Sequence, residues 1–172
     1  MKLILIGSAR HGKDTVAEIL QKKFNLNFTS SSIEAARIFL FDELKDKYKY
    51  KDFYECFEDR VNHRKEWYDK ICAYNKEEPA RLATEIFKSS SIYVGMRSGI
   101  ELTRCKELNL VDYIVGVYNP RIPEESPDSF DINMWKESDF IIPNAGTLQD
   151  LEGKVTKLFS NLLLGFHTNR LN

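Results

Sequence analysis

Cysteine is scarce in this sequence, with three residues among 172 and no C-x-x-C pair. An odd number of dispersed cysteines does not form a disulfide framework or a cysteine-based zinc site. We therefore expect reduced thiols in a cytoplasmic protein, located in the host cytoplasm if the source is a virus.

Long apolar runs are also missing. The first apolar run covers only residues 3–6, and the mean hydropathy is -0.42. A run of four residues is too short for the core of a signal peptide, and no stretch of 18 apolar residues occurs. These absences predict a soluble chain that does not contact a membrane.

The sequence lacks an excess of charge of either sign. It has 25 Lys+Arg against 26 Asp+Glu, which gives a formal net charge of -1. A nearly neutral chain has no general attraction for polyanions, so stable binding of nucleic acid is not expected. A small anionic ligand would have to be held by locally placed cations.

Glycine and proline are few, at 8 and 5 residues, and they are scattered rather than gathered into a linker. The length of 172 residues suits a single domain. Strands are expected at residues 3–6, near 28, and at 92–94, 113–118 and 140–142. Helices are expected at residues 14–24, from an N-cap at Ser32, in two segments between 52 and 88, at 98–108, and at 147–164 behind a Thr147–Asp150 capping box. This alternation predicts a three-layer α/β fold with a mostly parallel sheet of about five strands.

The segment between the first strand and the first helix reads GSARHGK and fits G-x-x-x-x-G-K. Gly7 and Gly12 allow the backbone to wrap a phosphate group, with Arg10 and His11 in the same loop, while Lys13 reaches the outer phosphates. The alternative is a glycine-rich turn that carries an ordinary surface lysine. The position between a strand and a helix favours an ATP-binding loop.

The residue after the lysine is Asp14, where Ser or Thr is usual. A carboxylate beside a triphosphate would be repelled unless a divalent cation lay between them, which favours Asp14 as a Mg²⁺ ligand. The alternative is an acid that complements the dipole of the helix. Thr15 can offer its hydroxyl group to the inner phosphate.

The run GKDT and the segment DFIIPNAGTLQDL near the end of the chain resemble the bacteriophage-type deoxynucleoside monophosphate kinases, a branch of the P-loop nucleotide kinases. The resemblance implies a P-loop NTPase fold that uses ATP and Mg²⁺. It implies a core at residues 1–29 and 90–172, a helical acceptor-binding flap at about 30–89, and a short lid at about 119–135.

The resemblance also places the turn from Asn144 to Gly146 beside the adenine of ATP. Taken alone, Asn-x-Gly is a turn followed by a helix cap. In the flap, helical spacing over residues 53–72 places Arg60 and Arg64 on one apolar stripe together with Trp67. These residues are candidates for binding the acceptor, with Ser31 at the mouth of the flap. The alternative for the two arginines is a pair of surface ion pairs.

Arg97 follows the strand that ends near Gly95, at the sheet edge where α/β folds bind ligands. Related kinases often carry an acid, one residue and an arginine at this place, and here Gly95 replaces the acid. Arg97 is a candidate for the acceptor's phosphate and for catalysis. Arg121 is the candidate of the lid, where a solvated loop arginine is the alternative.

These patterns predict phosphoryl transfer from ATP to the 5′-phosphate of a (deoxy)nucleoside monophosphate, with small-molecule nucleotides as partners and a homodimer as a possible assembly. One alternative is a P-loop kinase for another small metabolite such as dephospho-coenzyme A. The other is a nucleotide-binding regulatory protein without turnover, which the missing acid at Gly95 suggests. Neither the accepted base and sugar nor a choice between monomer and homodimer follows from the sequence.

Overall fold

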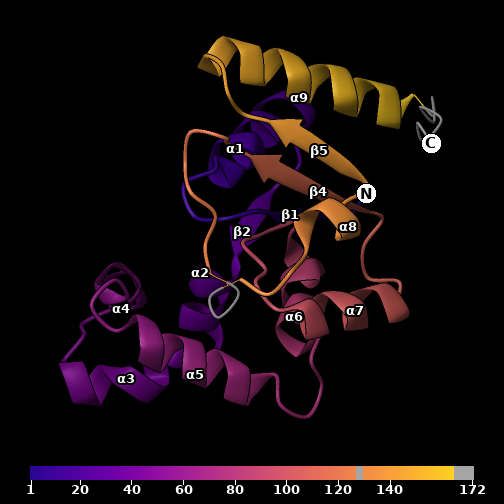
Figure 1. Cartoon of the computed structure of the whole chain (residues 1–172). Coiled ribbons are helices and arrows are strands. Elements are labelled where there is room, and N and C mark those ends of the chain that lie inside the picture. Colours follow the sequence, from indigo (N-terminus) through magenta and orange to yellow (C-terminus); the bar gives the residue numbers. More distant parts are fainter. Residues whose placement is uncertain (127–129, 165–172) are drawn as a thin grey trace.

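One parallel sheet of five strands organises the chain in the order β2-β3-β1-β4-β5 (Figure 1). The structure is a computed structural model that describes residues 1–126 and 130–164. The strands are β1 (Leu3–Ile6), β2 (Phe28–Ser30), β3 (Ile92–Val94), β4 (Tyr113–Tyr118) and β5 (Phe140–Pro143). The predicted α/β class and all the predicted strands are confirmed.

The strand order changes direction at β1, which pairs with β3 on one side and with β4 on the other. In parallel sheets, ligands bind beyond the carboxyl ends of the strands at such a switch point. The segment that follows β1 is residues 7–12, so the topology places the glycine-rich loop at this position.

Helices cover both faces of the sheet. Two of them, α1 (Lys13–Phe24) and α9 (Leu148–Leu163), pack together on one face (Figure 1). The other helical elements are α2 (Ser31–Ala35), the π-helical turn η1 (Ala36–Leu40), α3 (Phe41–Tyr48), α4 (Phe53–Asp59), α5 (Arg64–Tyr74), α6 (Arg81–Ser89), α7 (Gly99–Glu107) and α8 (Met134–Glu137). β1 alternates between the two cores, with Leu3 and Leu5 facing α1 and Ile4 and Ile6 facing the other side.

The helices from α2 to α6 follow β2 and precede β3 in the sequence. Figure 1 shows α3, α4 and α5 extending away from the sheet. The predicted N-cap at Ser32 is wrong, because the Ser30 hydroxyl accepts the Ile33 amide and α2 begins at Ser31. α9 begins as predicted, with a reciprocal capping box between Thr147 and Asp150.

The expected helical stripe over residues 53–72 is also wrong, since the chain turns between α4 and α5. The Asn62 and His63 amides donate to the carbonyls of Asp59 and Arg60, and the Asp59 carboxylate accepts the Asn62 side chain at 2.6 Å. These local hydrogen bonds compete with continuation of the helix. Arg60 and Arg64 therefore belong to different elements.

In the part of the chain that the structure describes, no helix has the length and apolar character needed to cross a membrane.

Candidate functional site

The loop from Gly7 to Gly12 joins β1 to α1, and its glycines are required by geometry. Gly7 has φ +140°, and a Cβ atom there would collide with the Val117 carbonyl oxygen of β4. Gly12 caps α1 with φ +100°, and a Cβ atom there would collide with the Asn144 side chain. Both positions combine a left-handed backbone with no room for a side chain, as a loop that wraps closely around a ligand needs.

Lys13 is held inside this loop. Its side chain is buried, and Nζ donates to the carbonyl oxygens of Gly7 and Ser8, each at 2.8 Å. Burial of the ammonium group, reinforced by the positive charge of Arg97, lowers the pKa of Lys13 to about 8. The loop therefore holds a poorly solvated cation close to its own backbone.

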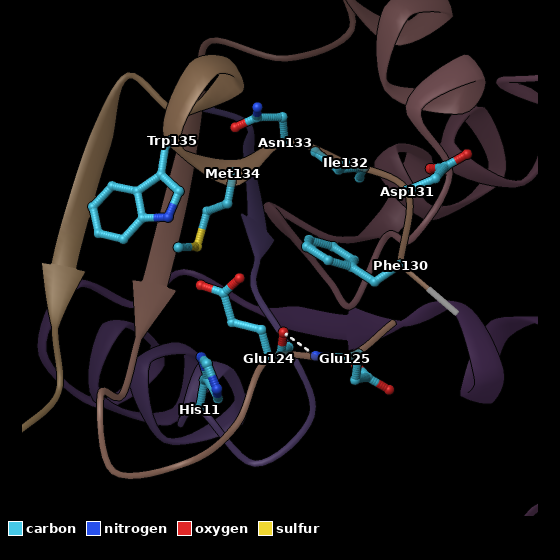
Figure 2. Close-up of a pocket in the computed structure, with 10 residues that line it drawn as sticks. His11, Glu124, Glu125, Phe130, Asp131, Ile132, Asn133, Met134 and Trp135 are labelled. Carbon is cyan, nitrogen blue, oxygen red and sulfur yellow. Dashed lines mark hydrogen bonds between the residues drawn. The ribbon is translucent and has the colours of Figure 1, made fainter. Parts of the chain in front are cut away.

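A carboxylate from a distant segment lies against the same loop. The Ala9 amide donates to Glu125 Oε2 at 2.7 Å, and Arg97 Nη1 donates to Oε1 and Oε2 at 2.9 and 3.0 Å. The Glu125 amide donates to Ser8 Oγ at 3.0 Å, which Figure 2 shows as a dashed line. Burial raises the pKa of the Glu125 carboxyl, but the hydrogen bonds from Arg97 and Ala9 outweigh burial, so this pKa lies below its usual value.

Glu125 is a site residue that the sequence analysis missed. It follows β4, as Gly7 follows β1, and the carboxyl ends of neighbouring parallel strands meet at one sheet edge. This position after β4 is the signal in the sequence that could have pointed to the segment of Glu125. It makes the segment after β4 a neighbour of the glycine-rich loop, without showing which side chain makes the contact.

His11 connects the loop to the segment after β4. It is 1% exposed, and its Nδ1 accepts the Asn119 amide at 3.3 Å. The proton of the neutral ring is therefore on Nε2, which donates to the Ile122 carbonyl oxygen at 3.2 Å. His11 positions the two segments relative to each other.

The turn after β5 reaches the loop as well. The Asn144 side-chain amide donates to the His11 carbonyl oxygen at 3.0 Å, and its backbone amide donates to Tyr118 at 2.7 Å. Gly146 packs against Asp150, where a Cβ atom would lie 2.6 Å from the carboxylate. The loop is thus braced by Asn144, and the role of this turn beside adenine stays a prediction.

Asp14 is the predicted Mg²⁺ ligand, and its surroundings can be compared with the ligands that Mg²⁺ prefers. Asp14 and Thr15 lie in the first turn of α1, where Asp14 is exposed. Over residues 1–126 and 130–164, no group of three or more His, Cys, Asp and Glu side chains could hold a metal ion. Mg²⁺ commonly binds through one or two carboxylates and the phosphates of its nucleotide. A site that combines Asp14 with bound phosphates fits this pattern.

The remaining predicted residues are more dispersed. Arg60 donates to the Phe57 carbonyl oxygen at 2.8 Å and lies over the Phe57 ring, whereas Arg64 is exposed at the start of α5. Trp67 is 4% exposed and belongs to the hydrophobic core. No hydrogen bond between described residues joins these three to the loop.

Two other candidates have different surroundings. Ser31 is the first residue of α2 and is half-buried. Arg121 is exposed in the segment after β4, and its backbone amide donates to Asn119 Oδ1 at 3.0 Å. Part of the expected lid, residues 127–129, lies outside the described residues.

A cavity of about 340 Å³ opens beside the loop. Ser8 and His11 form one side of it, and Figure 2 shows the Glu124 carboxylate pointing toward Met134. The full lining is Ser8, His11, Glu124, Glu125, Phe130, Asp131, Ile132, Asn133, Met134 and Trp135. The lining combines aromatic and apolar side chains with carboxylates and includes none of the predicted arginines.

No protein-family model and no curated protein matches the sequence. Solved structures are similar in fold. Shikimate kinase from Aquifex aeolicus has a TM-score of 0.53 at 11% identity, over 96% of this chain and 99% of that chain. Shikimate kinase from Acinetobacter baumannii, in complex with shikimate, has a TM-score of 0.51 at 15% identity, over 98% of this chain and 95% of that chain. At such identities the likeness establishes the fold alone, a parallel α/β sheet with helices on both faces that this chain shares with these kinases.

Proposed function

We propose that this chain transfers the γ-phosphoryl group of ATP to the 5′-phosphate of a (deoxy)nucleoside monophosphate and releases ADP. The observation that carries the proposal is the shared contact of the Ala9 amide and Arg97 with one carboxylate, at 2.7 to 3.0 Å. A donor on the phosphate loop and an arginine after β3 thus converge on a single oxyanion. Phosphoryl transfer needs this arrangement where donor and acceptor phosphates meet.

On the ATP side, the amides of residues 7–12 and the ammonium group of Lys13 bind the phosphates, with Thr15 near the inner ones. Lys13 Nζ now donates to the loop carbonyls at 2.8 Å and would exchange them for phosphate oxygens. Asp14 would hold Mg²⁺ together with the phosphates. When bound, Mg²⁺ neutralises charge on the transferring group.

On the acceptor side, Arg97 orients the monophosphate. Arg60, Arg64 and Ser31 approach from the flap, Trp67 stabilises the packing of the flap, and Arg121 contributes from the lid. An oxygen of the acceptor phosphate bonds to the γ-phosphorus while the bond to the β,γ-bridging oxygen breaks, and ADP leaves with that electron pair. The acceptor is already ionised at neutral pH, so no side chain has to remove a proton.

A second candidate is a kinase for a small hydroxyl-bearing metabolite, of the class to which shikimate belongs. The cavity beside Ser8 supports this candidate, because the Glu124 carboxylate, which points toward Met134 in Figure 2, lies in its lining and can accept hydrogen bonds from hydroxyl groups. The similar solved structures include a shikimate kinase in complex with shikimate.

The experiment is a coupled assay of ADP formation from ATP with purified protein and a panel of acceptors. The panel holds ribo- and deoxynucleoside monophosphates, shikimate and dephospho-coenzyme A. We expect turnover with one or a few monophosphates and none with the Lys13→Ala variant.

Turnover with shikimate or another alcohol alone would favour the second candidate. ATP binding without turnover on any acceptor would contradict both and favour a regulatory nucleotide-binding protein. Full activity of Lys13→Ala would exclude the loop as the phosphate site.

A further inference from the structure

The Glu125 carboxylate occupies donors that a phosphate group would use. It accepts the Ala9 amide of the phosphate loop and the guanidinium group of Arg97, and its side chain is 23% exposed. Lys13 is close enough for its positive charge to affect the carboxyl group. A carboxylate with these partners has the surroundings of a phosphoryl group.

The contact is also well anchored. Glu125 is bound through its backbone amide to Ser8 Oγ as well as through its side chain, and His11 holds Asn119 and Ile122 of the same segment. Glu125 lies 116 residues after Ala9 in the sequence. The fold therefore builds this contact between two distant parts of the chain.

One amide proton cannot serve a carboxylate and a phosphate oxygen at full strength together. Two anions at one place also repel each other, since each disfavours the charge of the other. A phosphate on the Ala9 amide and the Glu125 carboxylate on the same amide therefore exclude each other.

We propose that Glu125 is an internal competitor of phosphate. In the free protein it fills part of the phosphate site, and binding of a phosphate chain releases it from Ala9 and Arg97. The inference rests on the proposed phosphate-binding role of the loop and is independent of the acceptor. It assigns Glu125 a regulatory effect on affinity, because the apparent dissociation constant equals the intrinsic one divided by the fraction of protein in which the site is open.

The test compares Glu125→Gln with a control of the same chemistry, Glu18→Gln. Glu18 is exposed on α1, does not line the cavity and forms no hydrogen bond to a described residue. Dissociation constants are measured by calorimetry for pyrophosphate and for ATP, each with and without Mg²⁺. Thermal melts of both variants check that they are folded.

We expect Glu125→Gln to bind pyrophosphate and ATP about three- to tenfold more tightly than the wild type, with or without Mg²⁺. Glu18→Gln should stay within about twofold of the wild type. Unchanged or weaker binding by Glu125→Gln would overturn the proposal. Weaker binding only with Mg²⁺ would instead make Glu125 a metal ligand. If neither the wild type nor the variants bound pyrophosphate or ATP, the proposed function would fail as well. Equal binding by all three proteins would overturn only the role given to Glu125.

Discussion

Raising the pH from 7 to 9 should weaken the binding of ATP, because Lys13 loses its proton in this range. The pKa of Lys13 in the free protein is lowered to about 8, chiefly by burial and next by the charge of Arg97. Bound phosphates favour the charged ammonium form, so the pKa of Lys13 rises in the complex. Affinity is thus close to its full value at pH 7 and declines as the pH rises through about 8.

The magnitude follows from the proton linkage. At pH 7 about nine-tenths of the free protein carries a protonated Lys13, and at pH 9 about one-tenth does. The dissociation constant of ATP should therefore rise by about tenfold, which corresponds to about 1.4 kcal/mol. Binding at pH 9 should also take up close to one proton.

Calorimetry measures both quantities when the titration is repeated in buffers with different ionisation enthalpies. The matched control is Lys13→Arg, whose guanidinium group stays charged over the whole range. The comparison uses the pH dependence of each protein and not its absolute affinity: the dissociation constant of ATP for Lys13→Arg should stay constant from pH 7 to 9. A flat profile for the wild type, or an equal slope in both proteins, would refute the role given to Lys13.

Three further predictions address other parts of the structure. Gly12→Ala should lower the free energy of unfolding by about 1–3 kcal/mol and weaken ATP binding at least about tenfold, because φ is +100° and Asn144 fills the space. Urea unfolding measures the first effect and calorimetry the second. Arg64→Ala, at the exposed start of α5, should raise the KM of the acceptor or lower kcat while the dissociation constant of ATP stays nearly unchanged, and loss of ATP binding would contradict this. Burial raises the pKa of Glu101 to about 7, so the folded protein holds this proton more tightly than the unfolded chain does. The free energy of unfolding should therefore fall by at most about 3 kcal/mol as the pH rises from 5 to 8. Glu101→Gln should remove this pH dependence in urea unfolding, and an unchanged pH dependence in the variant would contradict the assignment.

The sheet and the position of the glycine-rich loop between β1 and α1 could be predicted from the sequence because local patterns determine them. A short apolar run that ends at Gly7 is typical of a strand buried on both faces, and the following glycine and lysine spacing has few other structural uses. The capping box at Thr147 is a similarly local pattern, formed by side chains three residues apart.

Other features depend on contacts that sequence spacing does not reveal. The turn after Asp59 has no glycine or proline to mark it and is made by side-chain hydrogen bonds, so the flap was interpreted with too few helices. The contact of Glu125 with Ala9 spans 116 residues and depends on the order of the strands. The same holds for the brace that Asn144 provides to the loop.

The most direct test of the account follows the terminal phosphoryl group of ATP itself. ATP labelled in its γ-phosphate is incubated with the protein, Mg²⁺ and each nucleoside monophosphate, and the products are separated. The account predicts that the label appears in a nucleoside diphosphate and that Lys13→Ala yields none. Label that stays in ATP, or that appears only as orthophosphate with every acceptor, would contradict it.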